Sequence, residues 1–333
     1  MPKLTQVILD FWVSTMLLLR HMRAGLLAAV IGASIFPFAA SADDCQPMID
    51  EFNQFVDAGQ ESDAQSVIDR IATSAECGRY QVPAQRRLAA LRLDSAHSLM
   101  ARGRPVGDYE RLLVAADSPE VLWQAAATLA EVRFGERRFV EAAQAYDRGI
   151  EIIKNETRTP IVPSKFDIEQ LVERAGQARL LAASGVGSGG GEKFVKAARD
   201  QRDGTLGGFY SRSVRGIIPH AIPVPITFEY RKTVFTEVGQ QAARELIDVL
   251  KEQAPARISL VGHTDIRGTA EFNMKLSRER AEAVSAFLQQ NGINVTIETD
   301  GKGAMEPMRL SDSSGLTQED IYALNRRVEW RRE

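Results

Sequence analysis

Hydrophobic residues recur with the spacing of amphipathic helices over residues 43–183, and strand-like alternation is rare there. The clearest pair of helices spans 122–153, with a break at Gly135 between the two. Ala130 and Ala142 are small residues at positions where paired helices can approach closely. The pattern predicts an all-α solenoid of helical hairpins whose neighbours bury a continuous core.

The last part of the chain, residues 225–333, alternates between strand-like and helix-like segments. Strands are expected at 226–230, 257–262, 295–299 and 328–330. Amphipathic stripes at 243–250 and 276–288 predict one helix before and one helix after the second strand. The order β-α-β-α-β-β predicts a mixed sheet with its helices on one face, so the whole chain is expected to be α+β.

A stretch rich in glycine and serine at 184–191 separates the two parts and predicts a flexible joint. Prolines keep the chain extended after it, so we interpret 184–224 as a linker and extended segment. The glycines have a faint similarity to a phosphate-binding loop, but Glu192, Lys193 and Phe194 stand where such a loop ends in Gly-Lys-Ser/Thr. Glu192 would also repel a phosphate group, so nucleotide binding is not expected.

Residues 1–42 contain the parts of a secretory signal peptide: a short basic start, an apolar stretch and an A-x-A-like ending at 40–42. Translation that begins at Met22 or Met16 would make the preceding residues an upstream extension. A membrane anchor is the alternative, because the apolar run 24–40 approaches the length that spans a bilayer.

The exported part of the chain keeps two cysteines, Cys45 and Cys77. In an oxidising compartment an even pair is most simply a disulfide, which would tie the N-terminus to the end of the next helical hairpin. Two free thiols are the alternative, because spacing alone does not fix pairing. Asp43 and Asp44 separate Cys45 from the A-x-A-like ending, so Cys45 is poorly placed to carry a lipid.

The composition excludes several classes of protein. Lys+Arg is 41 against Asp+Glu 44, so the basic excess that is typical of nucleic-acid-binding proteins is absent. Two Cys and four His are too few for a Cys-rich zinc module. With 44% hydrophobic residues, the chain can bury one large or two medium cores. We therefore expect a folded protein with no metal, no cofactor and no nucleic-acid partner.

The residues from 225 to 333 resemble the OmpA-like peptidoglycan-associated domain. The motifs are, in chain order, Val261-Gly262-His263-Thr264-Asp265, Gly268, Phe272-Asn273, Leu276-Ser277-Arg278-Glu279-Arg280-Ala281, Gly301-Lys302-Gly303, Pro307 and Asn325-Arg326-Arg327-Val328-Glu329. Two segments depart from the family pattern, the turn at 231–233 and the long polar stretch 309–324. The resemblance implies non-covalent peptidoglycan binding in the periplasm of a Gram-negative bacterium, with association with the outer membrane as a further expectation.

Asp265 and Arg280 are the candidate ligand-binding pair. Asp265 directly follows a strand end beside Gly268, and Asn273, Ser277 and Arg280 share one face of a continuous helix by their i, i+4, i+7 spacing. A helix that begins with Ser277 as its cap is the alternative, with Arg280 in the first turn. A carboxylate and a guanidinium that face one pocket suit a zwitterion. A plain ion pair between the two residues is the other interpretation.

The resemblance implies that Asp265 takes the ammonium group and Arg280 a carboxylate of diaminopimelate in the peptidoglycan stem peptide. It points to neighbours of this pair at Asn273, Leu276, Asn325 and Arg326. No catalytic residue is expected, because no G-x-S-x-G nucleophile motif accompanies His263.

The helical pair at 122–153 resembles a degenerate tetratricopeptide repeat, with Gly149 and Lys154 where that family has alanine and proline. Such a module binds a peptide or a protein, or it acts as a spacer. We expect an envelope protein whose C-terminal domain tethers a helical interaction module to the cell wall. The alternative is a scaffold of an envelope complex, in which the repeats bind a protein partner and wall binding is secondary or lost.

Overall fold

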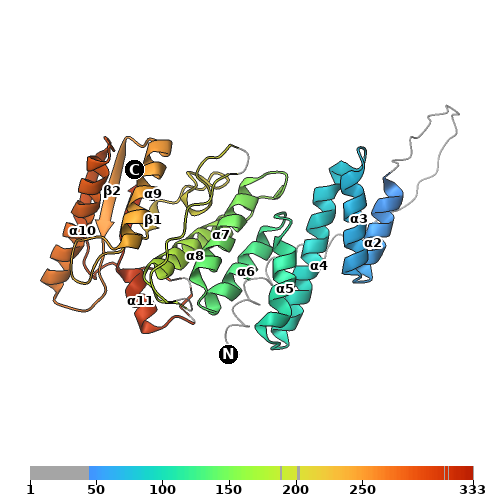
Figure 1. The fold of residues 1–333 in the computed structure, drawn as a ribbon, viewed down its shortest axis with the longest axis horizontal. Coiled ribbons are helices and arrows are strands. Elements are labelled where there is room, and N and C mark those ends of the chain that lie inside the picture. Colours follow the sequence, from blue (N-terminus) through green and yellow to red (C-terminus); the bar gives the residue numbers. More distant parts are fainter. Residues whose placement is uncertain (1–44, 188–189, 201–202, 311, 314, 333) are drawn as a thin grey trace, which may run out of the picture.

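The computed structural model describes residues 45–187, 190–200, 203–310, 312–313 and 315–332 (Figure 1). The signal peptide expected at 1–42 lies outside the described residues. Within these ranges, no helix combines the length and the apolar composition that crossing a membrane requires. The molecule is elongated, with the helical hairpins at one end and the sheet at the other (Figure 1).

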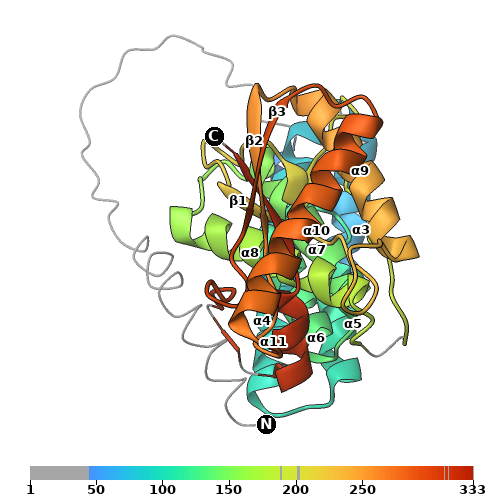
Figure 2. The same cartoon turned by 90° about the vertical axis from the view of Figure 1, so that its left-hand side faces the viewer.

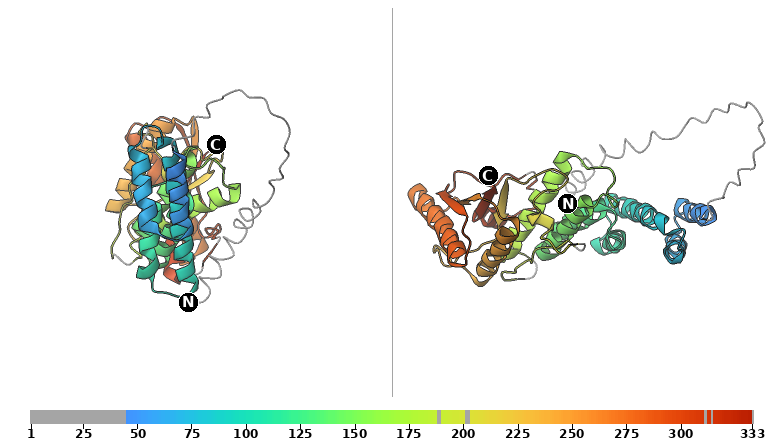
Figure 3. Two further views of the ribbon diagram at one scale, coloured as in Figure 1. Left: turned by 90° about the vertical axis from the view of Figure 1, so that its right-hand side faces the viewer. Right: turned by 90° about the horizontal axis from the view of Figure 1, so that it is seen from above.

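The first half of the chain folds into helical hairpins, as the periodicity predicts. Its helices are α2 (Gln46–Asp57), α3 (Glu61–Thr73), α4 (Gln81–Ala101), α5 (Val106–Asp117), α6 (Trp123–Gly135), α7 (Phe139–Lys154) and α8 (Lys165–Ala183). Helices that are neighbours in sequence also pack against each other, and the arm formed by α2 to α5 extends away from the sheet (Figure 3).

Small residues set the distance between α6, α7 and α8. Ala130 and Ala142 are fully buried, in agreement with the close approach expected there. Gly149 of α7 departs from the tetratricopeptide pattern, and the packing gives the reason. A Cβ atom at this position would lie 3.3 Å from Cδ2 of Leu171 in α8 and 3.6 Å from Cβ of Ala126. The resemblance to a tetratricopeptide repeat itself stays a prediction.

The N-terminal end of the arm has a small core of its own. Phe52, Ile68 and Leu88, from α2, α3 and α4, belong to an apolar cluster that is separate from the main core. Cys45 and Cys77 are joined in a disulfide at the edge of this cluster. The bond connects the start of α2 to the turn before α4, so it closes the helical hairpin against the next helix.

The C-terminal part contains a four-stranded mixed sheet. Its strands are β1 (Ala221–Val224), β2 (Arg257–Gly262), β3 (Thr296–Gly301) and β4 (Val328–Arg332), in the spatial order β1-β4-β2-β3. β2 and β3 are parallel, whereas β4 is antiparallel to both β1 and β2. The helices are α9 (Glu237–Gln253), α10 (Ala270–Gln290) and α11 (Gln318–Asn325). Both α9 and α10 lie on the same side of the sheet (Figure 2).

Side chains alternate between an apolar and a polar face of the sheet. Leu260 of β2 and Trp330 of β4 lie opposite each other and are fully buried. On the other face Val261 lies opposite Glu329, which is bonded to Arg327 and Arg331. Because the apolar face packs against the helices, polar and apolar residues alternate along the strands, and this alternation predicted strands in this region from the sequence.

The first strand predicted in this region, at 226–230, is wrong. The strand that pairs with β4 is Ala221–Val224, inside the stretch that we interpreted as a linker. Proline at position 223 is tolerated because β1 is an edge strand and has a ladder partner on one side only. After β1 the chain forms a loop over the start of α9, where the N–H of Thr236 donates to the carbonyl of Thr227 at 3.1 Å.

The polar stretch 309–324 also holds an element that the β-α-β-α-β-β order misses. Helix α11 lies between β3 and β4, and a capping box of Thr317 and Asp320 begins it. With only eight residues, this helix is too short to give a strong periodic pattern in the sequence. The observed order of the elements is therefore β-α-β-α-β-α-β, with α11 added before the last strand. The α+β class with a mixed sheet is nevertheless confirmed.

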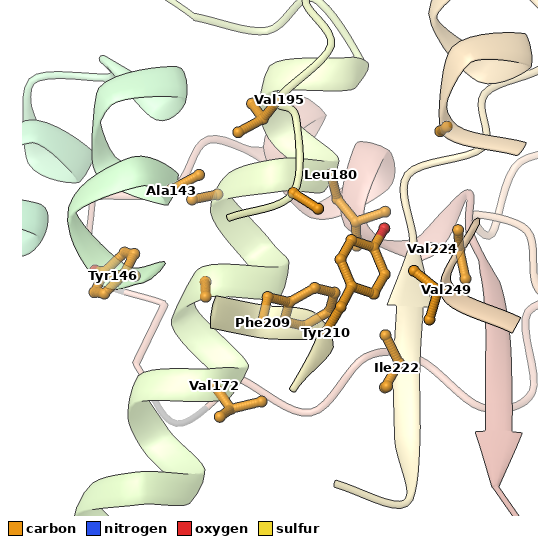
Figure 4. Packing of buried hydrophobic residues seen from close by; sticks show 14 of the residues in the cluster. Ala143, Tyr146, Val172, Leu180, Val195, Phe209, Tyr210, Ile222, Val224 and Val249 are labelled. Atoms are coloured by element: carbon orange, nitrogen blue, oxygen red, sulfur yellow. The ribbon is translucent and has the colours of Figure 1, made fainter. Parts of the chain in front are cut away.

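The segment after the glycine-rich stretch is not a free linker. Val195, Leu206, Phe209, Tyr210 and Val214 are buried in one core that extends from the helical module to the sheet. Phe209 and Tyr210 lie between α8 and β1 (Figure 4). Their irregular spacing has neither helical nor strand period, so the sequence pattern gave no sign of this burial.

A buried ion pair fixes this segment to the helices. Arg179 of α8 is 1% exposed and bonds to Asp147 of α7, and it also donates from Nη1 to the carbonyl of Val195 at 2.7 Å. The other carboxylate oxygen of Asp147 accepts from the N–H of Phe209 at 2.9 Å. One charge pair therefore holds two helices and two points of the connecting segment together.

Replacing Arg179 with alanine should lower the free energy of unfolding by about 3–5 kcal/mol, because Asp147 would keep a buried charge without its partner. Arg158→Ala is the control, since Arg158 pairs with Glu120 near the surface with both side chains 30% exposed. Its loss should stay below about 1 kcal/mol. Equilibrium unfolding in guanidinium chloride measures both variants, and equal midpoints would contradict the role of the buried pair.

Candidate functional site

A cavity of about 780 Å³ opens where β2 ends, between α10, α11 and the loop that precedes α9. Its lining contains Thr227, Phe228, Tyr230 and Arg231 from the loop, Thr264, Asp265, Arg267, Gly268 and Thr269 after β2, Phe272, Asn273, Leu276 and Arg280 from α10, Glu319 and Arg326 at α11, and Ser184 and Glu192 from the end of the helical module. Charged groups of both signs therefore face one space, which suits a ligand that carries both charges.

The backbone around Asp265 is fixed by the strands on either side. The N–H of His263 donates to the carbonyl of Arg327, and the N–H of Thr264 donates to the carbonyl of Gly303, both at 2.9 Å. The side-chain amide of Asn273 donates to the carbonyl of Asp265 at 3.3 Å. These bonds place the carboxylate at the edge of the cavity, where the side chain is 8% exposed.

Two guanidinium groups already contact the Asp265 carboxylate. Arg267 donates from Nη2 at 2.6 Å and Arg326 from Nη1 at 2.9 Å, both to Oδ2. The N–H of Arg267 donates to Oδ1 at 3.0 Å. Burial raises the pKa of Asp265, but the hydrogen bonds from Arg267 and Arg326 outweigh it, so the pKa lies below its ordinary value. The carboxylate is ionised at neutral pH.

Arg280 carries the second charge of the candidate pair and is 7% exposed. Its Nε donates to the carbonyl of Lys232 at 3.2 Å, and its guanidinium lies 4.9 Å from the ring centroid of Phe228. Among the described residues, none forms a hydrogen bond or an ion pair with its two terminal nitrogens. Burial and the nearby cation of Arg326 lower the pKa of Arg280 to about 10, so the group is charged at neutral pH.

The position of Arg280 follows from the packing of α10. The helix runs unbroken from Ala270 to Gln290 with Thr269 as its cap, so the alternative start at Ser277 is wrong. Ser277 is fully buried, and its hydroxyl accepts from the N–H of Gly303 at 2.9 Å. Asn273 and Arg280 thus lie on the face that contacts the end of β2.

Glycines of the sheet allow α10 to approach this closely. A Cβ atom at Gly262 would lie 1.9 Å from the carbonyl oxygen of Ser277, which no real side chain permits. A Cβ atom at Gly301 would lie 2.4 Å from the backbone nitrogen of Arg278. The glycines that the resemblance singled out are therefore required by the contact that positions the site.

Five of the six residues predicted for the site line this one cavity: Asp265, Asn273, Leu276, Arg280 and Arg326. Asn325 does not belong to the lining. Its side chain accepts from the N–H of Met308 at 2.8 Å and donates to the carbonyl of Ile321 at 2.7 Å, so it fixes the end of α11. Asn325 is a structural residue beside the site.

Sequence reasoning missed several residues of the lining. Arg267 is close enough in sequence to Asp265 that a carboxylate followed by a cation could have drawn attention. Glu319 lies in the helix that was not predicted, and it bonds to Arg326 at 3.0 Å. Glu192 directly follows the glycine-rich stretch 184–191 and lies 73 residues before Asp265 along the chain, and no local pattern connects the two. Across the described ranges, no cluster of His, Cys, Asp and Glu could hold a metal ion.

The C-terminal part of the chain is similar to known proteins. Residues 227–320 match the model of the OmpA family. The chain is 31% identical over 155 residues to the peptidoglycan-associated lipoprotein of Pseudomonas aeruginosa, a match that covers 45% of this chain and 89% of that protein. It is 40% identical over 107 residues to outer membrane protein A of Bordetella avium, covering 31% of this chain and 50% of that protein.

Part of the chain is also similar to a solved structure. The peptidoglycan-associated lipoprotein from Burkholderia pseudomallei is 25% identical, and the match covers 34% of this chain and 91% of that chain with a TM-score of 0.28. The chain spans about half the length of several curated relatives that it matches. The match to the family model lies in the C-terminal part that holds the cavity.

The double variant Arg267→Ala/Arg326→Ala should raise the pKa of Asp265 to its ordinary value or above it, because burial then acts without the two guanidinium groups. A carboxyl group with a lowered pKa stabilises the fold above about pH 4, and this contribution is lost as the pH falls through the folded-state value. The double variant should therefore lose less stability than the wild type on acidification below about pH 4.

Carbon-detected NMR titration of the Asp265 carboxyl measures this shift. Arg257→Ala is the control, because Arg257 lies at the far end of β2 and pairs with Glu298 on the surface. It should leave the pKa of Asp265 unchanged. An Asp265 pKa that stays low in the double variant would show that groups other than Arg267 and Arg326 stabilise the ionised carboxylate.

Proposed function

Because this chain belongs to the OmpA family, we propose that its C-terminal domain binds peptidoglycan non-covalently through the cavity at the end of β2. The ligand group is the diaminopimelate of the stem peptide, whose side chain ends in one ammonium group and one carboxylate. The names of the relatives, outer membrane protein A and peptidoglycan-associated lipoprotein, support this assignment.

The observation that carries the proposal is that the two terminal nitrogens of Arg280 have no hydrogen-bond or ion-pair partner among the residues that the structure describes. A buried cation that forms no ion pair is unfavourable, so an incoming carboxylate gains strongly from contact with it. The two terminal nitrogens of arginine can hold both oxygens of a carboxylate in parallel bonds. Asp265, which lines the same cavity, supplies negative charge for the ammonium end of the zwitterion.

The helical module extends the proposal from binding to tethering. Its arm α2 to α5 reaches away from the cavity, so a partner held on the arm would not cover the wall-binding site (Figure 1). We propose that a protein partner binds this arm and that the chain holds it at the cell wall. The chain would act in the periplasm of a Gram-negative bacterium near the outer membrane, with no catalytic role.

Wild-type protein should sediment with purified diaminopimelate-type peptidoglycan, and Arg280→Ala should reduce the bound fraction strongly. Loss of a charge-assisted pair corresponds to a decrease in affinity of about tenfold to a hundredfold. Arg278→Ala is the matched control, because Arg278 lies in the same helix but is exposed and outside the cavity. It should bind like the wild type.

Asp265→Ala should also weaken sedimentation, because it removes the carboxylate that faces the ammonium group. Circular dichroism on each variant separates loss of binding from loss of fold. Equal sedimentation of wild type, Arg280→Ala and Asp265→Ala would contradict the assignment of this cavity, even if the chain binds peptidoglycan elsewhere.

A further inference from the structure

The end of the helical module forms part of the ligand cavity. Ser184, the last cap of α8, and Glu192 line the same space as Asp265 and Arg280. Glu192 is exposed and belongs to the stretch that separates the two halves in sequence. The cavity is thus built by two modules, and Glu192 lies before the OmpA-family region at 227–320 in the sequence.

The carboxylates that line the cavity differ in whether they form ion pairs. Asp265 is bonded to Arg267 at 2.6 Å and to Arg326 at 2.9 Å. Glu319 pairs with the same two arginines, at 3.4 Å and 3.0 Å. Glu192 has no ion pair with any residue that the structure describes, so it is the lining carboxylate that remains available for an ammonium group.

The backbone beside Glu192 is held in place rather than free to leave the cavity. The N–H of Lys193 donates to the carbonyl of Ala182 at 2.9 Å. The carbonyl of Val195 accepts from Arg179 at 2.7 Å, and Val195 is buried in the main core. This anchoring keeps the carboxylate of Glu192 close to the cavity when the site is empty, which lowers the entropic cost of using it for a ligand.

We propose that Glu192 shares the ammonium group of the ligand with Asp265, while Arg280 receives a carboxylate. The inference rests on the proposed function and deepens it. Because two guanidinium groups are already bonded to Asp265, its carboxylate alone attracts an ammonium ion weakly, and the unpaired Glu192 supplies the larger part of the attraction. The site would then select stem peptides whose diaminopimelate amine is free and discriminate against those in which a crosslink has acylated it.

Isothermal titration calorimetry of the full chain tests this with two peptides. One is the tripeptide L-Ala-γ-D-Glu-diaminopimelate, and the other is the same tripeptide acetylated on its side-chain amine. Wild-type protein should bind the free amine about tenfold more tightly, because acetylation removes the charge that Glu192 contacts. Glu192→Gln should lose most of this preference, because only Asp265, already bonded to two guanidinium groups, then faces the ammonium group.

Glu156→Gln is the control, because Glu156 is also exposed but lies outside the cavity, and it should keep the full preference. A Glu192→Gln variant that still prefers the free amine about tenfold would overturn the role of Glu192 and leave the proposed function standing. A wild type that binds neither peptide would overturn both. A wild type that binds both peptides equally would overturn the selectivity alone.

Discussion

The close approach of α10 to the sheet is the constraint on which the charge pattern of the cavity depends. Gly262 leaves no side chain between the sheet and the backbone of Ser277, so the helix lies directly on the end of β2. This contact holds Arg280 in a nearly buried position, where its Nε donates to the carbonyl of Lys232 and its two terminal nitrogens have no hydrogen-bond or ion-pair partner in the described part of the chain. A guanidinium that is shielded from water and forms no ion pair is a strong site for a carboxylate.

The helical module and the sheet domain share one core, and this sharing extends to the site. Arg137 of the helical module forms paired hydrogen bonds with the buried Asp320 of α11, at 2.5 and 2.8 Å. The same short helix carries Glu319, and Arg326 caps its end. A displacement of α6 and α7 would therefore move α11 and change the cavity wall.

The sequence predicted the parts of the molecule that have a regular period or a set of spaced motifs. The helical hairpins, three of the four expected strands, both helices expected beside the sheet, and the positions of Asp265, Asn273 and Arg280 at one cavity follow from such patterns. The strand Ala221–Val224 was not predicted, because a strand of four residues with an internal proline shows no clear alternation of polar and apolar residues. The burial of the segment around Phe209 and the position of Glu192 at the cavity were not predicted, because they result from tertiary packing and no local spacing in the sequence encodes them.

The most direct measurement is a crystal structure of the full chain with the tripeptide L-Ala-γ-D-Glu-diaminopimelate bound. The account predicts one diaminopimelate carboxylate within about 3 Å of the terminal nitrogens of Arg280. A peptide seated elsewhere on the molecule, or one whose carboxylates leave Arg280 without a contact, would contradict it.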